Sequence, residues 1–245
     1  PIAWPNTVLN TIVAESLDHI ITELEEAAGE KPTPTKIKSA VRKVLKSVVK
    51  SHKRVLYSGD NYTQAWEEEA RERGLPNLKA SPEALAAMGE KKARDLFKSY
   101  KVLSPVELDA RRLTFLEQYS LRLDIEARTA LSAVKTLILP GVVRYQTELA
   151  ENIAAMQAAD VDCEDGRGAL QDYAELVVRL RGSTATLDER LARIDHEDAA
   201  RTAEYFRDEI IPAMGDVREV VDELERVTAD DQWPLPTYRE LLFLR

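Results

Sequence analysis

The feature that most constrains this chain is one long helical pattern between Ser104 and Met156. The stretch Ser104-Pro105-Val106-Glu107 has the composition of a capping box, in which serine and glutamate satisfy free amides at the start of a helix. Apolar residues recur after it at helical spacing: Leu113, Leu116, Tyr119, Leu123, Ala127, Ala130, Leu131, Val134, Ile138, Val142, Tyr145, Leu149 and Ile153. Such a helix would extend about 75 Å, because each residue adds about 1.5 Å.

Pro140 and Gly141 lie inside this pattern. Proline removes one backbone donor and normally bends a helix or breaks it. The apolar stripe nevertheless keeps its phase across the site, because Val134, Ile138 and Val142 follow one another at steps of four. We therefore predict one central helix that is kinked at Pro140 and continues beyond it.

The N-terminal part of the chain predicts further helices. The first has an apolar face from Val8 to Leu24 and stops at Gly29, and Thr35 is expected to cap the second. A short helix is predicted from Asp60 or Asn61 to Gly74, and a longer one from a capping Ser81 to Tyr100.

The C-terminal part predicts a polar loop at 160–168 and then more helices. One helix should end at Gly182, and Thr186-Leu187-Asp188-Glu189 should cap the next, which continues to Ile210 before a break at Pro212 and Gly215. A last helical stretch is predicted to Asp230, followed by an extended proline-rich tail with one apolar turn at 239–244. The predicted fold class is all-α, an elongated bundle of long antiparallel helices.

Composition limits where such a chain works. The single cysteine, Cys163, excludes an internal disulfide framework and fits a reducing compartment. No apolar run approaches the roughly 20 residues that a membrane span needs, and the first residues lack the basic start and apolar core of a signal peptide. We therefore expect a cytoplasmic protein without a membrane partner.

Charge is distributed unevenly along the chain, whose net charge is −9. Between Lys31 and Gly59 there is no acidic residue, and the basic ones are Lys31, Lys36, Lys38, Arg42, Lys43, Lys46, Lys50, Lys53 and Arg54. This basic helix, residues 36–54, could bind nucleic acid or an acidic membrane surface. An exposed face that pairs with acidic protein surface is favoured instead, because the chain as a whole is acidic; no nucleic-acid partner is expected. Lysine is absent after Lys135, so arginine supplies all the later basic side chains. This change in composition near residues 140–165 is compatible with either a second subdomain or a continuous bundle.

No arrangement of reactive side chains predicts a catalytic, cofactor-binding or metal site. His19 lies four residues from both Glu15 and Glu23, which favours a solvated ion-pair stripe. His52 follows the apolar stripe of its helix and is expected to be partly buried, whereas the neighbours of His196 point to different faces. Cys163 is surrounded by carboxylates, which oppose formation of a nucleophilic thiolate.

Several stretches, taken together, resemble the C-terminal region of type III glutamine synthetases. The first is residues 5–17, Pro-Asn-Thr-Val-Leu-Asn-Thr-Ile-Val-Ala-Glu-Ser-Leu, which looks like the helix after the catalytic core of that family. Others are similar to its later parts: residues 52–62 with Trp66 and 73–78, residues 117–119, 124–127 and 138–146, and the closing Trp233-Pro234-Leu235-Pro236-Thr237-Tyr238. They follow the family's order over nearly the whole chain.

The resemblance implies a parent enzyme that makes glutamine from glutamate and ammonia with ATP and Mg²⁺, in large oligomers. Because the family's catalytic residues lie before the Pro-Asn-Thr motif, none is carried onto this chain, and Pro1 and Trp4 are expected to mark a truncation junction or altered start. The implied organisation is a helix continuing from the catalytic core (1–30), a basic helix with short helices (31–103), a long-helix bundle (104–232) and a tail (233–245).

The implied role is structural: packing on the catalytic portion, contact with neighbouring subunits of a homo-oligomer, or binding of a regulator. No cofactor is expected in this chain, and the chain alone is expected to be inactive. The alternative is a stand-alone helical protein-interaction module with no ligase attached.

Overall fold

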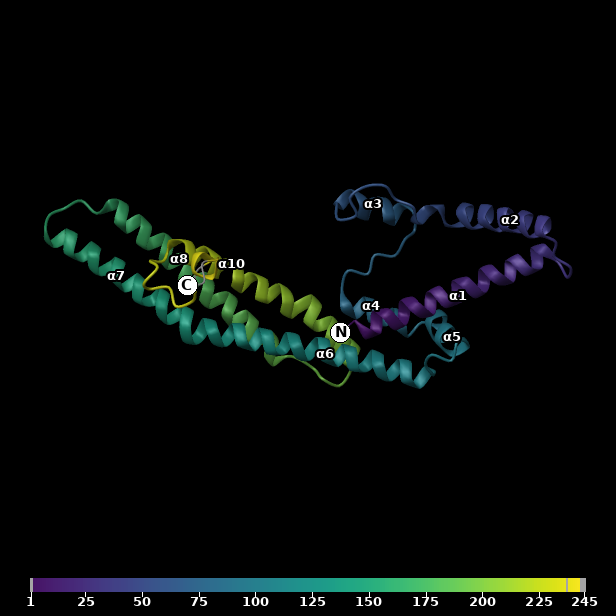
Figure 1. Ribbon diagram of the computed structural model, residues 1–245. Coiled ribbons are helices and arrows are strands. Elements are labelled where there is room, and N and C mark those ends of the chain that lie inside the picture. The colour runs from purple at the N-terminus through teal and green to yellow at the C-terminus, as the bar shows by residue number, and fades with distance from the viewer. Residues whose placement is uncertain (1, 237, 243–245) are drawn as a thin grey trace. The chain divides into compact units, whose positions relative to one another are not determined.

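The computed structural model describes residues 2–236 and 238–242, and every regular element in these ranges is helical, which confirms the all-α prediction. The chain forms two compact units, Pro1–Arg112 and Leu113–Arg245 (Figure 1).

The first unit is built around a helical hairpin. Its helices are α1 (Ala3–Ala28), α2 (Pro34–His52), a 3-10 turn (Lys53–Val55), α3 (Gln64–Glu72), α4 (Ser81–Met88), α5 (Lys91–Ser99) and the first turns of α6 (Pro105–Ala133). α1 packs on both α2 and α5. The α1–α5 contact includes stacked rings of Trp4 and Phe97, 5.7 Å between centroids, and a bond of 2.8 Å from the Tyr100 hydroxyl to Asp18.

Several helix ends in this unit differ from the sequence prediction. α1 ends as expected at Gly29, whose φ of 75° suits glycine. α2 is capped by Thr33, not Thr35, because the Thr33 side chain accepts the Lys36 amide at 3.3 Å. The predicted helix from Ser81 to Tyr100 is interrupted at Gly89-Glu90, and Ser81 lies inside α4 instead of capping it.

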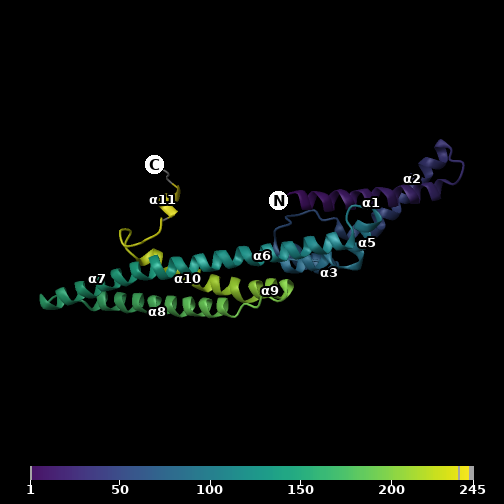
Figure 2. The ribbon, with the colours of Figure 1, turned by 90° about the horizontal axis from the view of Figure 1, so that it is seen from below.

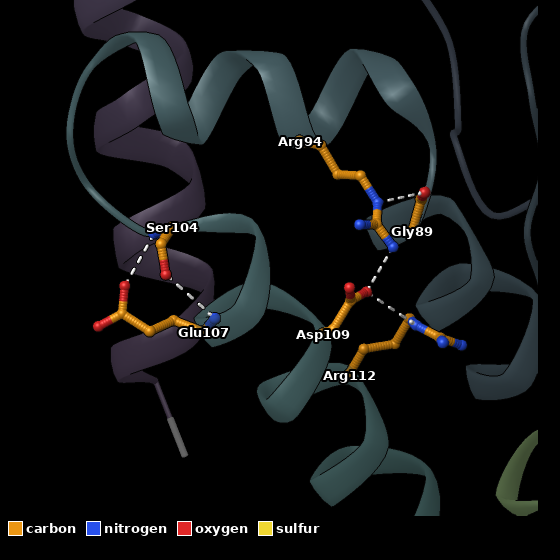
Figure 3. Close-up of polar contacts among 6 residues, drawn as sticks. All are labelled: Gly89, Arg94, Ser104, Glu107, Asp109 and Arg112. Atoms are coloured by element: carbon orange, nitrogen blue, oxygen red, sulfur yellow. Dashed lines mark hydrogen bonds and ion pairs between the residues drawn. The ribbon is translucent and has the colours of Figure 1, made fainter.

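The capping box at Ser104 forms as predicted. The Glu107 carboxylate accepts the Ser104 amide at 2.8 Å, and the Ser104 hydroxyl accepts the Glu107 amide at 3.3 Å (Figure 3). From there one helix of 54 residues continues through α6, a π-helical turn (Val134–Ile138) and α7 (Leu139–Ala158). The prediction that the helix continues past Pro140 is therefore confirmed, and its irregular turn precedes the proline.

The rest of the second unit returns along the long helix. It contains α8 (Glu164–Ala192), α9 (Ala199–Tyr205), a π-helical turn (Phe206–Ile210), α10 (Ile211–Val227) and α11 (Tyr238–Leu242). α8 packs on α7 and on α10, so the long helices lie antiparallel (Figure 2). Of the predicted extended tail, residues 233–236 are non-helical, and the predicted apolar turn is α11 as far as it is described, since residues 243–244 lie outside the described ranges.

Two predicted boundaries in this unit are wrong. α8 runs without interruption through Gly182, and the Thr186 hydroxyl donates to the Gly182 carbonyl at 3.1 Å instead of capping a new helix. The actual break is at residues 193–198, where Asp198 accepts the amides of Ala200 and Arg201. Glycine lowers helix propensity by only about 1 kcal/mol, so a well-packed helix passes over it.

The predicted break at Pro212 and Gly215 is also absent. The helix passes from the π-helical turn at 206–210 directly into α10, with Pro212 in the first turn of α10. Pro140 has the same setting in α7. In each case the residue before the proline, Leu139 or Ile211, donates its amide to the carbonyl five residues earlier.

The second unit encloses a continuous apolar core along these helices. Its buried members are Ala127, Leu131, Val134, Ile138, Val142, Tyr173, Val177, Leu180, Leu187, Leu191, Phe206, Ile210, Ala213, Val217, Val220, Leu224 and Trp233. The one phenol among them, Tyr173, lies 2.8 Å from the Thr228 hydroxyl, which itself donates to the Leu224 carbonyl at 2.7 Å. Tyr173 is therefore the donor of the first bond, and the buried hydroxyls are satisfied in series.

The capping box predicts a pH effect on stability. Its hydrogen bonds, first the one from the Ser104 amide, lower the pKa of Glu107 below its ordinary 4.5. A lowered carboxyl pKa stabilises the fold fully above the unfolded value and loses that stabilisation as pH falls through the folded value. Glu107→Gln should therefore lower the free energy of unfolding at pH 7, with the difference from the wild type vanishing in acid. Urea titrations at a series of pH values measure it.

The control for this effect is Glu126→Gln, an exposed change on the same helix. A stability difference for Glu107→Gln that is unchanged in acid would contradict the proposed role of the carboxylate.

Candidate functional site

Two stretches that carry the resemblance, residues 138–146 and the closing Trp-Pro-Leu-Pro, meet in the second unit. Gly141 is buried in α7, and an added Cβ there would lie 3.0 Å from the Gln232 carbonyl oxygen and 3.1 Å from Pro234 Cδ. Distances of 3.0–3.1 Å are shorter than ordinary van der Waals contacts. The tail therefore already fills the space beside Gly141. Glycine at this position lets the tail lie directly on the long helix.

The tail is held at this place by its own turn and by burial. The amides of Gln232 and Trp233 both donate to the Ala229 carbonyl, at 2.9 and 3.0 Å, and Trp233 belongs to the apolar core. Leu235, the residue after Pro234, is partly buried and also packs against that core. The sequence predicted only that Pro140 and Gly141 bend the helix. It did not predict that the tail packs against Gly141.

A second cluster lies in the first unit and joins residues 52–62 to residues 66–78. The Arg73 guanidinium donates to the carbonyls of Arg54 and Leu56 at 3.0 and 2.8 Å and pairs with Glu69. It also lies over the Trp66 ring, 5.5 Å from the centroid, and Trp66 stacks on Tyr57 at 4.1 Å. Through these contacts, Arg73, Trp66 and Tyr57 hold the loop between α2 and α3 in place.

A third polar cluster joins α4, α5 and the start of α6. Arg94 donates from Nε to the Gly89 carbonyl at 2.9 Å and from its terminal nitrogen to Asp109 at 2.6 Å (Figure 3). Arg112 Nε lies 4.0 Å from the same Asp109 oxygen. The cluster satisfies the end of α4, which has no glycine in the left-handed region, and it fixes the corner before the capping box.

The histidines and the cysteine are not brought together. His19 is exposed and lies 3.7 Å from Glu23, as the ion-pair interpretation predicted. His52 is exposed, so the prediction of partial burial is wrong: it is the last residue of α2, and Val48 is the last residue of that helix that is not exposed. His196 lies exposed in the 193–198 break, and Cys163 is a buried free thiol at the start of α8.

The structure offers no metal site in the ranges that it describes. No group of three or more His, Cys, Asp or Glu residues there is close enough to hold a metal ion. These residues therefore do not fit the Mg²⁺ that the resemblance implies for the parent enzyme. Within the described ranges, none of the helices combines the length and the apolar composition of a membrane span.

Two shallow cavities lie between helices. One of about 530 Å³ is bordered by α7 and α8, with Gln146, Arg167 and Gln171 among its lining residues. The other, of about 660 Å³, lies at the α1–α2 turn and is lined by Leu24, Pro32, Ile37 and Val41, with Glu25 and Glu30 beside them.

The face of the first unit formed by α1 is unusually apolar. α1 buries only Thr11, yet it presents large aliphatic side chains to solvent, each exposed by 44–59%: Leu9, Ile12, Val13, Leu17 and Ile21. A solvated helix that displays such a row is typical of an interaction surface. This α1 face and the cations of α2 are the strongest candidate functional surface of the chain.

Comparison with known proteins shows which family the chain belongs to. Residues 40–157 match the glutamine synthetase C-terminal domain family. The chain is 34% identical to the type-3 glutamine synthetase of Dictyostelium discoideum over 99% of its length and 33% of that relative. It is 31% identical to a glutamine synthetase of Butyrivibrio fibrisolvens and 27% identical to one of Bacteroides fragilis, in each case over 84% of this chain and 30% and 29% of the relative.

These matches define the class as the C-terminal domain of glutamine synthetases. Within that class, the chain corresponds to the C-terminal region of the type III enzymes, as its motifs predicted. It spans about a third of the length of the curated relatives it matches.

The contact between Gly141 and the tail predicts the effect of Gly141→Ala. The new methyl group would press on Gln232 and Pro234, so we expect a loss of about 1–3 kcal/mol in the free energy of unfolding, typical of overpacking. The matched control is Gly182→Ala in α8, where nothing lies within 4 Å and alanine should stabilise the helix by about 0.5–1 kcal/mol. Denaturant titration measures both, and equal stabilisation by the two changes would contradict the assigned contact.

The loop cluster gives a second prediction. Arg73→Lys keeps the charge but removes the planar fork that reaches two carbonyls and stacks on Trp66. Amide hydrogen exchange in residues 53–75 should become faster, while exchange in the core of the second unit stays unchanged. Arg71→Lys, an exposed change in α3 two residues before Arg73, serves as the control.

Proposed function

We propose that this region serves a type III glutamine synthetase as a non-catalytic helical part, through packing on the catalytic portion, oligomer assembly or binding of a regulator. The parent reaction would be ATP-dependent formation of glutamine from glutamate and ammonia. The observation that carries the proposal is the α1 face, whose five aliphatic side chains are exposed in a chain that aligns with a third of a larger relative.

The energetic argument is that these side chains gain stability only by losing contact with water. Burial of apolar surface contributes roughly 25 cal/mol per Å². Five half-exposed aliphatic side chains on one helix therefore represent a substantial unused contribution, which a partner surface would supply. A polar α1 would have served equally well if this helix only linked two parts of a chain.

Catalysis is assigned elsewhere in the parent enzyme for a chemical reason. Phosphoryl transfer to glutamate requires clustered metal ligands and cations that neutralise phosphate charge. Among the described residues, one ion pair joins α8 and α10, with Arg179 and Glu223 at 2.7 and 3.1 Å.

The alternative function is a stand-alone helical interaction module. The same exposed α1 face favours it, since a partner need not be a glutamine synthetase. The two differ in one requirement: only the first needs a catalytic portion encoded with this region or supplied by another chain.

The purified chain should not form glutamine. With ATP, Mg²⁺, glutamate and ammonium, we expect product at the level of a blank without protein, because no metal-ligand cluster is present in its described part. Glutamine formation by the chain alone, or ATP held at micromolar affinity, would contradict the non-catalytic role.

The packing role is tested by supplying the catalytic portion of a type III enzyme separately, with and without this chain. We expect glutamine formation to require the chain and to be lost when Val13 and Leu17 are both changed to serine. Val178→Ser is the matched control, because Val178 is exposed on α8 in the second unit. Full activity of the catalytic portion alone would favour the stand-alone module.

A further inference from the structure

The helix α2 has two sides of different chemistry. Ala40 and Val44 are buried and Val48 is partly buried, and this side faces α1, the helix on which α2 packs. α2 contains no acidic residue, and its lysines and arginine are all exposed: Lys36, Lys38, Arg42, Lys43, Lys46 and Lys50. No carboxylate of the helix itself therefore neutralises them.

These six cations are also not used by the rest of the unit. None of them forms an ion pair with a residue that the structure describes. Within the described ranges, the whole positive charge of α2 therefore remains available to an outside partner.

Two large apolar side chains share the exposed side with the cations. Leu45 and Val49 are exposed by 57% and 58%. At steps of four, three and four residues, one stripe of the helix surface carries two cations and then these two side chains: Lys38, Arg42, Leu45 and Val49. This outer stripe lies away from the buried side and is about 16 Å long, because each residue adds about 1.5 Å.

The composition of the outer stripe distinguishes among anionic partners. A nucleic acid would pair its phosphates with the cations but would leave Leu45 and Val49 without an apolar contact. A helix at a membrane surface enters the lipid through its apolar side, and that side of α2 already faces α1. A helix that carries carboxylates beside aliphatic side chains satisfies both parts of the stripe.

We propose that the outer stripe of α2 is a docking site for an acidic amphipathic helix of a different protein. Carboxylates of that helix pair with Lys38 and Arg42, and its aliphatic side chains cover Leu45 and Val49. The inference gives a chemical class to the regulator in the proposed function, and it rests on that regulator-binding role. It uses α2, whereas packing on the catalytic portion is assigned to the α1 face.

The probe for this site is a synthetic peptide of about 21 residues, a length at which an isolated helix can form. Its heptads carry leucine at positions a and d and glutamate at e and g. Fluorescence anisotropy of the labelled peptide with the full chain should show saturable binding. Binding should weaken at least about tenfold between about 0.05 and 0.5 M salt, because exposed charges are screened. The matched control peptide, with lysine at e and g, should not bind.

Two variants of the chain separate the charged part of the stripe from the apolar part. Lys38→Glu with Arg42→Glu turns attraction into repulsion, and Leu45→Ser with Val49→Ser removes the apolar contact. Each should weaken binding of the acidic peptide by at least about tenfold. Circular dichroism confirms that each variant keeps its helical content.

Matched controls alter other surfaces of the same unit. Lys92→Glu with Lys98→Glu reverses two exposed cations of α5 and should leave binding of the peptide unchanged. Val13→Ser with Leu17→Ser alters the α1 face and should also leave it unchanged. Loss of binding in the α1 variant, with no loss in the α2 variants, would contradict the assignment to α2.

Absence of saturable binding at peptide concentrations up to about 1 mM would overturn the proposal. Tighter binding of duplex DNA or of phosphatidylserine vesicles, lost in the Lys38→Glu, Arg42→Glu variant, would assign the stripe to nucleic acid or to membrane instead. A dimer of the chain that the peptide does not dissociate would assign it to a second copy. Because the measurement needs no catalytic portion, its failure would leave the packing role of α1 standing, and a failed test of packing would leave this site standing.

Discussion

The bundle of the second unit depends on how two prolines are accommodated inside buried helices. A proline lacks the amide that would close one helical turn, and its ring collides with the carbonyl four residues earlier. Both Pro140 and Pro212 follow a π-helical turn, in which the preceding residue donates to a carbonyl five residues back. The wider turn moves the obstructing carbonyl aside, so each helix continues as one element.

The π-helical turns also keep the core in register. The residues at the two ends of each turn, Val134 and Ile138 in one and Phe206 and Ile210 in the other, are all buried. Since a π-turn holds slightly more than four residues, a spacing of four stays on one face. In the described part of the first unit, the α1 face is exposed, and polar clusters around Arg73 and Arg94 join the loops and short helices.

Much of this organisation could be predicted from the sequence, because it depends on local chemistry. The capping box at Ser104 and the stop at Gly29 follow from residues within one turn of each other. The wrong boundaries arose where tertiary packing outweighs a local signal, as at Gly182, Thr186 and Pro212. The contact between Gly141 and the tail could not be predicted, because its partners lie about ninety residues apart in the chain and no periodicity links them.

That separation has a consequence for biosynthesis. Gly141 emerges from the ribosome well before Gln232 and Pro234, the residues that cover it. At about 5–20 residues per second, the interval is roughly 5–20 s. During this time the face of α7 at Gly141 lacks the cover that Gln232 and Pro234 provide. Burial of Gly141 therefore waits for the synthesis of residues 232–234, and termination of translation after α10 would leave this face of α7 uncovered.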